Sequence, residues 1–234
     1  MQPESAIKER LENIIKKIEQ ATAKASRPAL SVKLIAVSKT FPLSAIKEAL
    51  NCGQSIFGEN YVQEAEEKHS ALKDTNAELH FIGRLQSNKA KTASRIFSMV
   101  QSVHSLSLAK ELSKHAQNLG KVLPILVQVN TSGENTKSGI YPEEAIALCR
   151  SVLSLPGVSL KGLMTIGSFV DEQSSYELRV KEFVLLRSLK IEAEKSLGVA
   201  LPELSMGMSH DFELAIGEGA TMVRVGSAIF GDRE

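Results

Sequence analysis

Short apolar segments alternate with longer amphipathic segments along this chain, and no other feature constrains the fold as strongly. Each short segment has little polar interruption and is partly β-branched, which is typical of a strand buried on both faces of a parallel sheet. We expect eight such strands, at residues 34–39, 55–60, 78–83, 99–104, 124–130, 160–166, 203–206 and 222–226.

Helical patterns fill the intervals between these strands, and no linker divides the chain into halves. We expect helices at residues 42–52, 61–73, 87–97, 105–119, from 142, 173–197 and 210–217, of which 61–73 is rich in Glu and Lys. The simplest closed arrangement of strands and helices that alternate in this way is a (β/α)8 barrel of the TIM type. A doubly wound open sheet is the alternative, although no glycine-rich dinucleotide turn follows the first strand.

The ends of the chain suggest one addition to this barrel. The sequence stops at Glu234, which leaves no room for a final helix after the last strand. Residues 4–26 form an amphipathic helical pattern whose apolar stripe is Ile7, Leu11, Ile14, Ile15 and Ile18. We therefore expect residues 1–234 to form a single domain, with residues 1–29 packing on the barrel where the last helix is missing.

Charge and cysteine content exclude several classes of function. The 28 basic and 27 acidic residues give a net charge of +1, which predicts neither a nucleic acid nor an anionic membrane as partner. Cys52 and Cys149 show no metal-type spacing, so we expect no metal site. No apolar run reaches transmembrane length. With no secretory signal and no disulfide framework, we expect a cytoplasmic protein.

Lys39 is the residue whose position points most directly to chemistry. It ends the first predicted strand, and in parallel α/β proteins ligands bind at the C-terminal ends of the strands. A lysine held against apolar walls loses some of its preference for charge, and its neutral amine can add to a carbonyl as a Schiff base. The ordinary alternative is a solvated charge at the end of a strand.

Two loops near the C-terminus have the features of a phosphate site. In (β/α)8 barrels phosphate sits in the loops after strands seven and eight. After strand seven, Ser205 and Ser209 supply hydroxyls, and Ser209 is expected to N-cap the next helix. After strand eight, Gly226 and Ser227 add backbone N–H groups and a further hydroxyl.

A Schiff-base lysine opposite a phosphate site selects two kinds of ligand. One is a phosphorylated sugar, as in an aldolase, with Glu59 as a candidate acid or base. The other is pyridoxal 5′-phosphate (PLP). Arg224, on strand eight, would then face the pyridine nitrogen and disfavour its protonation.

Six ordered motifs, from about residue 30 to the C-terminus, resemble those of the pyridoxal phosphate homeostasis proteins, which are related to the barrel domain of alanine racemase. The motifs are AVSKT at 36–40, FGENY at 57–61, HFIG at 80–83, GLMT at 162–165, SMGMSHD at 205–211 and VRVG at 223–226. This resemblance implies that Lys39 holds PLP as a Schiff base. It also implies that Ser205, Gly226 and Ser227 contact the phosphate, and that Asn60, His80, Met164 and Arg224 surround the cofactor.

A carrier of PLP and an amino-acid racemase remain the two main hypotheses. A racemase needs acid and base groups on both faces of the substrate α-carbon. In the related racemases a tyrosine from a second domain of the partner subunit serves one face, whereas Tyr61, Tyr141 and Tyr176 here fall in helices or at helix starts. We therefore expect a monomeric, non-catalytic PLP carrier or regulator in intracellular vitamin B6 homeostasis. Its candidate partners are PLP and PLP-dependent apo-enzymes.

Overall fold

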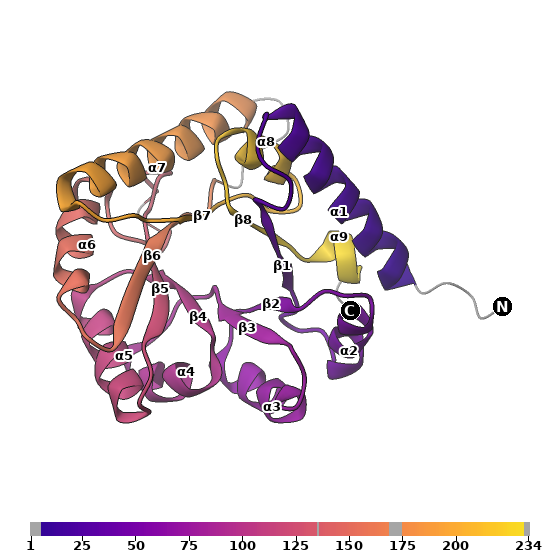
Figure 1. The fold of residues 1–234 in the computed structure, drawn as a ribbon, viewed down its shortest axis with the longest axis horizontal. Coiled ribbons are helices and arrows are strands. Elements are labelled where there is room, and N and C mark those ends of the chain that lie inside the picture. The colour runs from indigo at the N-terminus through magenta and orange to yellow at the C-terminus, as the bar shows by residue number, and fades with distance from the viewer. Residues whose placement is uncertain (1–5, 135, 169–174, 232–234) are drawn as a thin grey trace.

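The computed structural model describes residues 6–134, 136–168 and 175–231. Parallel strands form a closed barrel in chain order, from β1 beside β2 round to β8 beside β1, so the barrel prediction is confirmed (Figure 1). The strands are β1 (Lys33–Val37), β2 (Ile56–Glu59), β3 (Glu78–Phe81), β4 (Met99–Val103), β5 (Leu123–Gln128), β6 (Val158–Met164), β7 (Glu203–Ser205) and β8 (Met222–Val225).

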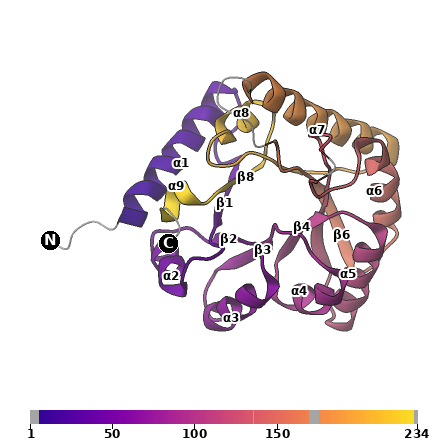
Figure 2. The same cartoon turned by 180° about the vertical axis from the view of Figure 1, so that it is seen from behind.

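Helices surround this barrel in both views (Figures 1 and 2). They are α2 (Leu43–Asn51), α3 (Val62–Leu72), α4 (Ala90–Ile96), α5 (Leu106–Asn118), α6 (Ala145–Leu153), α7 (Ser175–Leu197) and α8 (Phe212–Gly217). Single 3₁₀ turns, η1 (Ser87–Lys89) and η2 (Pro142–Glu144), lead into α4 and α6. Local sequence explains some of these boundaries, since the Ser105 hydroxyl accepts a hydrogen bond from the Leu108 N–H and caps α5.

Helix α1 (Ala6–Lys24) contacts α2, α8 and a short helix, α9 (Ser227–Phe230). It buries Ile7, Leu11, Ile14 and Ile18, whereas Ile15 of the predicted stripe stays exposed. Figure 1 shows α1 and α9 side by side across the outside of β8 and β1. The expectation that no helix follows strand eight is wrong, because α9 forms one helical turn there. Residues 4 and 5 of the predicted N-terminal helix lie outside the described residues.

Several strands end earlier than the apolar runs suggested. β1 stops at Val37, so Ser38 and Lys39 belong to the loop that follows it, and Asn60 lies just after β2. Pairing with the neighbouring strand decides where a strand ends, and apolar composition does not record that pairing. Lys39 and Asn60 are therefore carried by loops, whereas His80, Met164, Ser205 and Arg224 remain within their strands.

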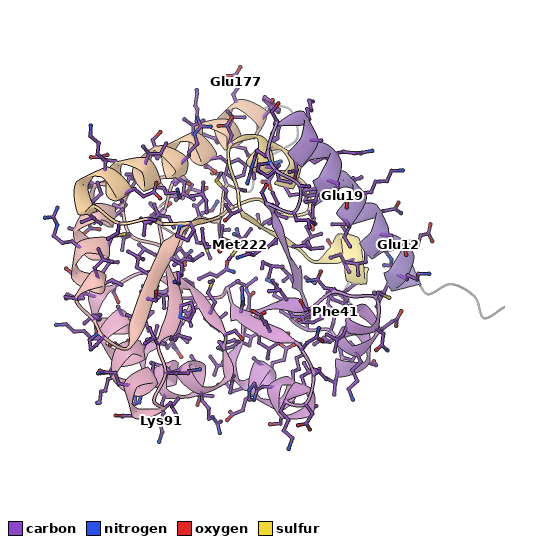
Figure 3. The ribbon with its side chains drawn as sticks, in the orientation of Figure 1. Glu12, Glu19, Phe41, Lys91, Glu177 and Met222 are labelled. Carbon is purple, nitrogen blue, oxygen red and sulfur yellow. The ribbon has the colours of Figure 1, made fainter. Side chains whose placement is uncertain are left out.

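The barrel interior is apolar in part and polar in part. Ile35, Met99, Leu126, Met164 and Met222 form an apolar cluster that is separate from the larger core beneath the helices. Met222 lies inside the ring of strands, whereas labelled charged side chains such as Glu12 and Lys91 point outward (Figure 3). The interior also holds polar residues, including His80, Gln101, Ser205 and Arg224. No described helix is long and apolar enough to cross a membrane.

Candidate functional site

A cavity of about 440 Å³ lies at the C-terminal end of the barrel strands. Its walls come from residues at the ends of β1, β2, β3, β6, β7 and β8 or just after them: Val37, Lys39, Asn60, Ile82, Ile166, Met208, Ser209, His210, Arg224, Gly226 and Ser227. Ligand sites of (β/α)8 barrels occupy this end. The structure thus brings six of the predicted site residues together: Lys39, Asn60, Ser209, Arg224, Gly226 and Ser227.

The other three predicted residues lie outside this lining. Ser205 and His80 are buried in the barrel interior and are joined through Gln101. The Ser205 hydroxyl donates to Oε1 of Gln101 over 2.6 Å, and Nε2 of Gln101 lies 3.0 Å from Nδ1 of His80. Met164 packs in the apolar cluster of the interior.

Arg224 lines the cavity although its side chain is buried. Nη1 donates to the Ser205 hydroxyl over 2.6 Å and Nη2 donates to the Thr165 carbonyl over 2.7 Å. Burial lowers the pKa of Arg224 to about 10, against the opposing effect of Asp211, so the group remains charged at neutral pH. No carboxylate in the described part of the chain forms a salt bridge with it.

This arrangement favours a ligand that offers an acceptor to Arg224. An arginine side chain has only donors, and a buried charge is costly unless it is paired or hydrogen-bonded. The two hydrogen-bond partners of Arg224 are neutral, and Asp211 acts on it only through longer-range attraction, so no described carboxylate pairs with it directly. An acceptor atom or an anionic group in the cavity would compensate its charge.

Ser209, Gly226 and Ser227 form the part of the wall suited to an anion. Ser227 begins α9, so its N–H and that of Ala228 have no acceptor within the helix. The Gly226 N–H points to the Ser209 hydroxyl over 3.4 Å. A Cβ at Gly226 would lie 3.3 Å from Val37, so glycine gives this loop room beside β1.

The prediction that Ser209 caps α8 is wrong. The N-cap of α8 is Asp211, whose Oδ1 accepts a hydrogen bond from the Met208 N–H over 2.6 Å. The Asp211 side chain thus bonds to the loop before α8 and makes no capping hydrogen bond to the helix itself. Ser209 instead contributes its side chain to the cavity wall, near Gly226.

Sequence reasoning missed several residues of the wall. Ile82, Ile166 and Met208 are apolar and resemble core residues, and His210 follows them in the same loop as Met208. The available signal was their place in or next to the motifs HFIG, GLMT and SMGMSHD. The lining also contains Asn60, whose Oδ1 is buried without a hydrogen-bond partner among the described residues.

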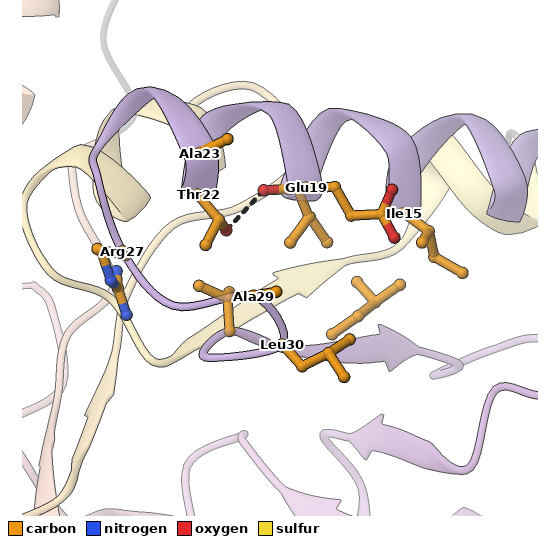
Figure 4. Close-up of a pocket in the computed structure, with 10 residues that line it drawn as sticks. Ile15, Glu19, Thr22, Ala23, Arg27, Ala29 and Leu30 are labelled. Atoms are coloured by element: carbon orange, nitrogen blue, oxygen red, sulfur yellow. Dashed lines mark hydrogen bonds between the residues drawn. The ribbon is translucent and has the colours of Figure 1, made fainter.

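A second hollow, of about 420 Å³, lies between α1 and the start of β1 (Figure 4). Its walls are largely apolar, and Leu30 on its rim is 90% exposed. Arg27 contributes its guanidinium, but Nη1 already donates to the carbonyls of Ile216 and Ala220 over 2.9 and 2.7 Å. The Thr22 hydroxyl likewise donates to the Ile18 carbonyl. This hollow therefore has fewer groups for recognising a polar ligand than the cavity at Lys39.

Known proteins are similar to this chain over almost its whole length. The family model described as alanine racemase, N-terminal domain, matches residues 10–234. The pyridoxal phosphate homeostasis protein of Aquifex aeolicus is 43% identical over 226 residues, which cover 97% of this chain and 98% of that protein. The pyridoxal phosphate homeostasis protein of Homo sapiens is 41% identical over 238 residues, covering 96% of this chain and 86% of that protein.

Solved structures agree with these relatives. PipY of Synechococcus elongatus, determined with PLP bound, is 37% identical with a TM-score of 0.81, and the match covers 96% of this chain and all of PipY. An alanine racemase of Clostridium difficile is 18% identical with a TM-score of 0.77, covering 94% of this chain and 56% of the racemase. At this identity, the similarity to the racemase shows a shared fold alone.

Proposed function

Since this chain belongs to the pyridoxal phosphate homeostasis protein family, we propose that it holds PLP in the cavity at the C-terminal end of the barrel, attached to Lys39. It binds PLP and acts in PLP homeostasis. The observation that carries the assignment of the site is one cavity that combines Lys39, Arg224 and the N-terminus of α9. Lys39 matches the aldehyde of PLP, Arg224 matches the acceptor nitrogen of its ring, and the N-terminus of α9 matches its phosphate.

The residues of the cavity fit PLP in charge and in hydrogen-bonding character. The phosphate suits Ser209 and Ser227, where hydroxyls meet N–H groups that have no acceptor within α9. Arg224 can only donate, so it suits an unprotonated pyridine nitrogen and keeps that nitrogen unprotonated. Asn60 also lines the cavity, and its buried Oδ1 has no hydrogen-bond partner among the described residues. PLP supplies an aldehyde that a neutral lysine amine can attack.

Four further residues are proposed to act from below the cavity. Ser205 accepts one hydrogen bond from Arg224 and so orients its guanidinium, and Gln101 and His80 continue this chain of contacts. Met164 contributes to the apolar packing under the site. Their proposed role is to fix the orientation of the Arg224 guanidinium group.

We propose a carrier or regulator rather than an enzyme. None of Tyr61, Tyr141 and Tyr176 lines the cavity, and all three are exposed, so no tyrosine of the described chain opposes Lys39 there. A racemase of the alanine racemase type is the second candidate, and one observation favours it. His210 is exposed and lines the cavity, where it offers a second titratable group.

The wider setting proposed for the chain follows the same reasoning. Residues 1–234 act as a single PLP-binding domain and as a monomer, in the cytoplasm, with PLP-dependent apo-enzymes as recipients. Cys52 and Cys149 are free thiols in the structure. Light scattering of the purified chain, with and without PLP, tests the monomer.

A transfer experiment distinguishes the two candidate functions. The PLP-loaded chain is identified by its absorbance at about 400 nm. It is mixed with a PLP-dependent apo-enzyme and, separately, with L-alanine. A carrier restores activity to the apo-enzyme and leaves L-alanine unchanged. Steady formation of D-alanine that is lost in His210→Ala would instead identify a racemase.

A further inference from the structure

A buried cluster of charged side chains lies where the β1 loop, β2 and α3 meet. It consists of Lys68, Glu59, Glu64 and Ser38, with the backbone of Thr40, and is called the Lys68 cluster below. The side chain of Lys68 is 7% exposed and that of Glu59 is 0% exposed. Lysine and glutamate are rarely buried to this extent unless they are paired.

The ammonium group of Lys68 uses all of its hydrogens within this cluster. It donates to Oε1 of Glu59 over 2.7 Å, to Oε1 of Glu64 over 2.6 Å and to the Ser38 carbonyl over 2.8 Å. Oε1 of Glu59 also accepts from the Ser38 hydroxyl over 2.6 Å. Since a lysine ammonium has three donors, these acceptors fix its direction.

Both peptide bonds that flank Lys39 are held by this cluster. The Ser38 carbonyl, which Lys68 contacts, belongs to the peptide bond before Lys39. The Thr40 N–H belongs to the peptide bond after Lys39, and it donates to Oε1 of Glu64 over 2.6 Å. Glu64 also forms an ion pair with Lys68. The two members of this pair therefore hydrogen-bond to the backbone on either side of Lys39, Lys68 before it and Glu64 after it.

The backbone beside Lys39 is strained, which is a second and independent observation. Thr40 has a φ of 68°, in the left-handed region. For a residue with a Cβ this region costs about 1–2 kcal/mol, and a β-branched residue there is an outlier. Such strain persists where the surrounding structure fixes it, and it is concentrated at functional sites.

We propose that the Lys68 cluster positions the amine of Lys39 for the attachment of PLP. Lys68 and Glu64 are positioning residues in this account, because they contact the backbone around Lys39 and not the ligand. Attachment joins the amine nitrogen to the aldehyde carbon as a C=N bond, and both amine hydrogens leave with the aldehyde oxygen as water. An error of about 1 Å in such a geometry slows a reaction by about a hundredfold. The inference rests on the proposed attachment at Lys39.

Two variants remove the grip on the backbone in different ways. Lys68→Met removes the ammonium group and leaves Glu59 buried without its cation. Glu64→Ala removes the acceptor of the Thr40 N–H but keeps the buried pair of Lys68 and Glu59, so it remains informative if Lys68→Met does not fold. Glu64→Gln is the conservative variant, since its side-chain carbonyl can still accept from Thr40. Lys190→Met is the matched control, because it breaks a Lys–Glu pair on α7 with the same spacing.

Two measurements separate positioning from general loss of structure. The first is the rate at which PLP becomes attached to Lys39, followed by visible absorbance and by borohydride trapping. The second is the affinity for pyridoxamine 5′-phosphate, which shares the ring and phosphate but has no aldehyde to attach. We expect Lys68→Met and Glu64→Ala to slow attachment by about tenfold or more, with the affinity for pyridoxamine 5′-phosphate within about twofold of wild type. Glu64→Gln restores most of the rate, and Lys190→Met leaves it unchanged.

The possible results separate this inference from the proposed function. If Lys68→Met and Glu64→Ala attach PLP at the wild-type rate and lose only thermal stability, the Lys68 cluster is structural and the inference is wrong. An equal loss of attachment and of pyridoxamine 5′-phosphate binding overturns it as well, because the cavity itself has then collapsed. If the wild-type chain attaches no PLP at Lys39 while binding pyridoxamine 5′-phosphate, the proposed attachment fails, and this inference fails with it.

Discussion

Arg224 and Lys68 are both buried cations close to the same cavity, but their surroundings differ in charge. Arg224 lies in the cavity wall, and its partners are a hydroxyl and a carbonyl, both neutral. Lys68 lies behind Lys39, and two of its three acceptors are carboxylates. Lys68 is paired directly with carboxylates, whereas Arg224 feels only the longer-range attraction of Asp211 and has no direct anionic partner among the described residues.

The difference assigns the two cations to different tasks. A cation neutralised by carboxylates contributes to a fixed structure, and removing it leaves a buried negative charge without a partner. A cation with neutral partners contributes less to the folded state and more to a complex with an electron-rich ligand. Substitution of Lys68 should therefore change mainly the stability of the fold and the placement of Lys39. Substitution of Arg224 should change mainly the affinity for the ligand.

The largest expected effect is that of Lys68→Met on stability. It should lower the free energy of unfolding by about 3–5 kcal/mol, because Glu59 remains buried without its cation. Urea unfolding of the ligand-free protein measures this change. The double variant Lys68→Met with Glu59→Met should recover part of the loss, since it removes both charges. A loss below about 1 kcal/mol in the single variant, typical of an exposed pair, would remove the distinction between the two cations.

Arg224→Met tests the other side of the comparison. It should weaken PLP binding by about 2–3 kcal/mol, the value of a hydrogen bond from a charged group. The ligand-free protein should lose only about 1 kcal/mol, because neutral partners alone are left unpaired. Titration with PLP and urea unfolding give the two quantities. Unchanged affinity with a large loss of stability would reverse the assignment.

Ser205→Ala sharpens the comparison at a smaller scale. The variant removes the hydroxyl that accepts from Nη1 of Arg224, so the guanidinium can turn away from the cavity. PLP retention should weaken by about 1–2 kcal/mol. Competition dialysis measures the loss, and Ser151→Ala on the exposed face of α6 serves as control. Equal PLP retention in both variants would separate Ser205 from the site.

The pH dependence of stability tests the surroundings of Glu59. Burial is the largest cause that raises the pKa of Glu59 above its usual value of 4.5, although hydrogen bonds from Lys68 and Ser38 oppose it. A raised carboxyl pKa means that the folded state binds the proton more tightly than the unfolded state. The stability contributed by this group is therefore fully present below the unfolded pKa, and it is lost as the pH rises through the folded pKa.

The variant Glu59→Gln has no carboxyl group at this position, so it lacks this pH-dependent contribution to stability. The free energy of unfolding of wild type, measured relative to Glu59→Gln in urea at a series of pH values, should therefore fall between the acid range and neutrality. A difference that rises over the same interval would mean that Lys68 overcomes burial and depresses the pKa of Glu59.

Much of the fold could be predicted because the barrel depends on a repeated pattern. Alternating apolar strands and amphipathic helices recur along the chain, and each repeat is detectable in composition alone. The four-residue helix α9 was missed because one turn leaves no periodic signal. The start of α8 was misplaced because the prediction relied on a capping side chain, whereas the N-cap residue Asp211 makes no side-chain hydrogen bond to the helix.

The candidate site was predictable where chemistry resides in single residues, as at Lys39, Arg224 and Ser227. Apolar walls such as Ile82 and Ile166 were not, because their sequence context is that of ordinary core residues. The Lys68 cluster was missed for a stronger reason. In a segment rich in Glu and Lys, a buried lysine looks like a solvated one until α3 packs against β2 and the β1 loop.

The most direct test of the account is borohydride reduction of the PLP-treated protein, followed by peptide mass mapping. The account predicts a pyridoxyl group on Lys39 and its absence from Lys39→Ala, which should still fold. An unmodified Lys39 in correctly folded protein, or a pyridoxyl group on another lysine, would contradict the assignment of the site.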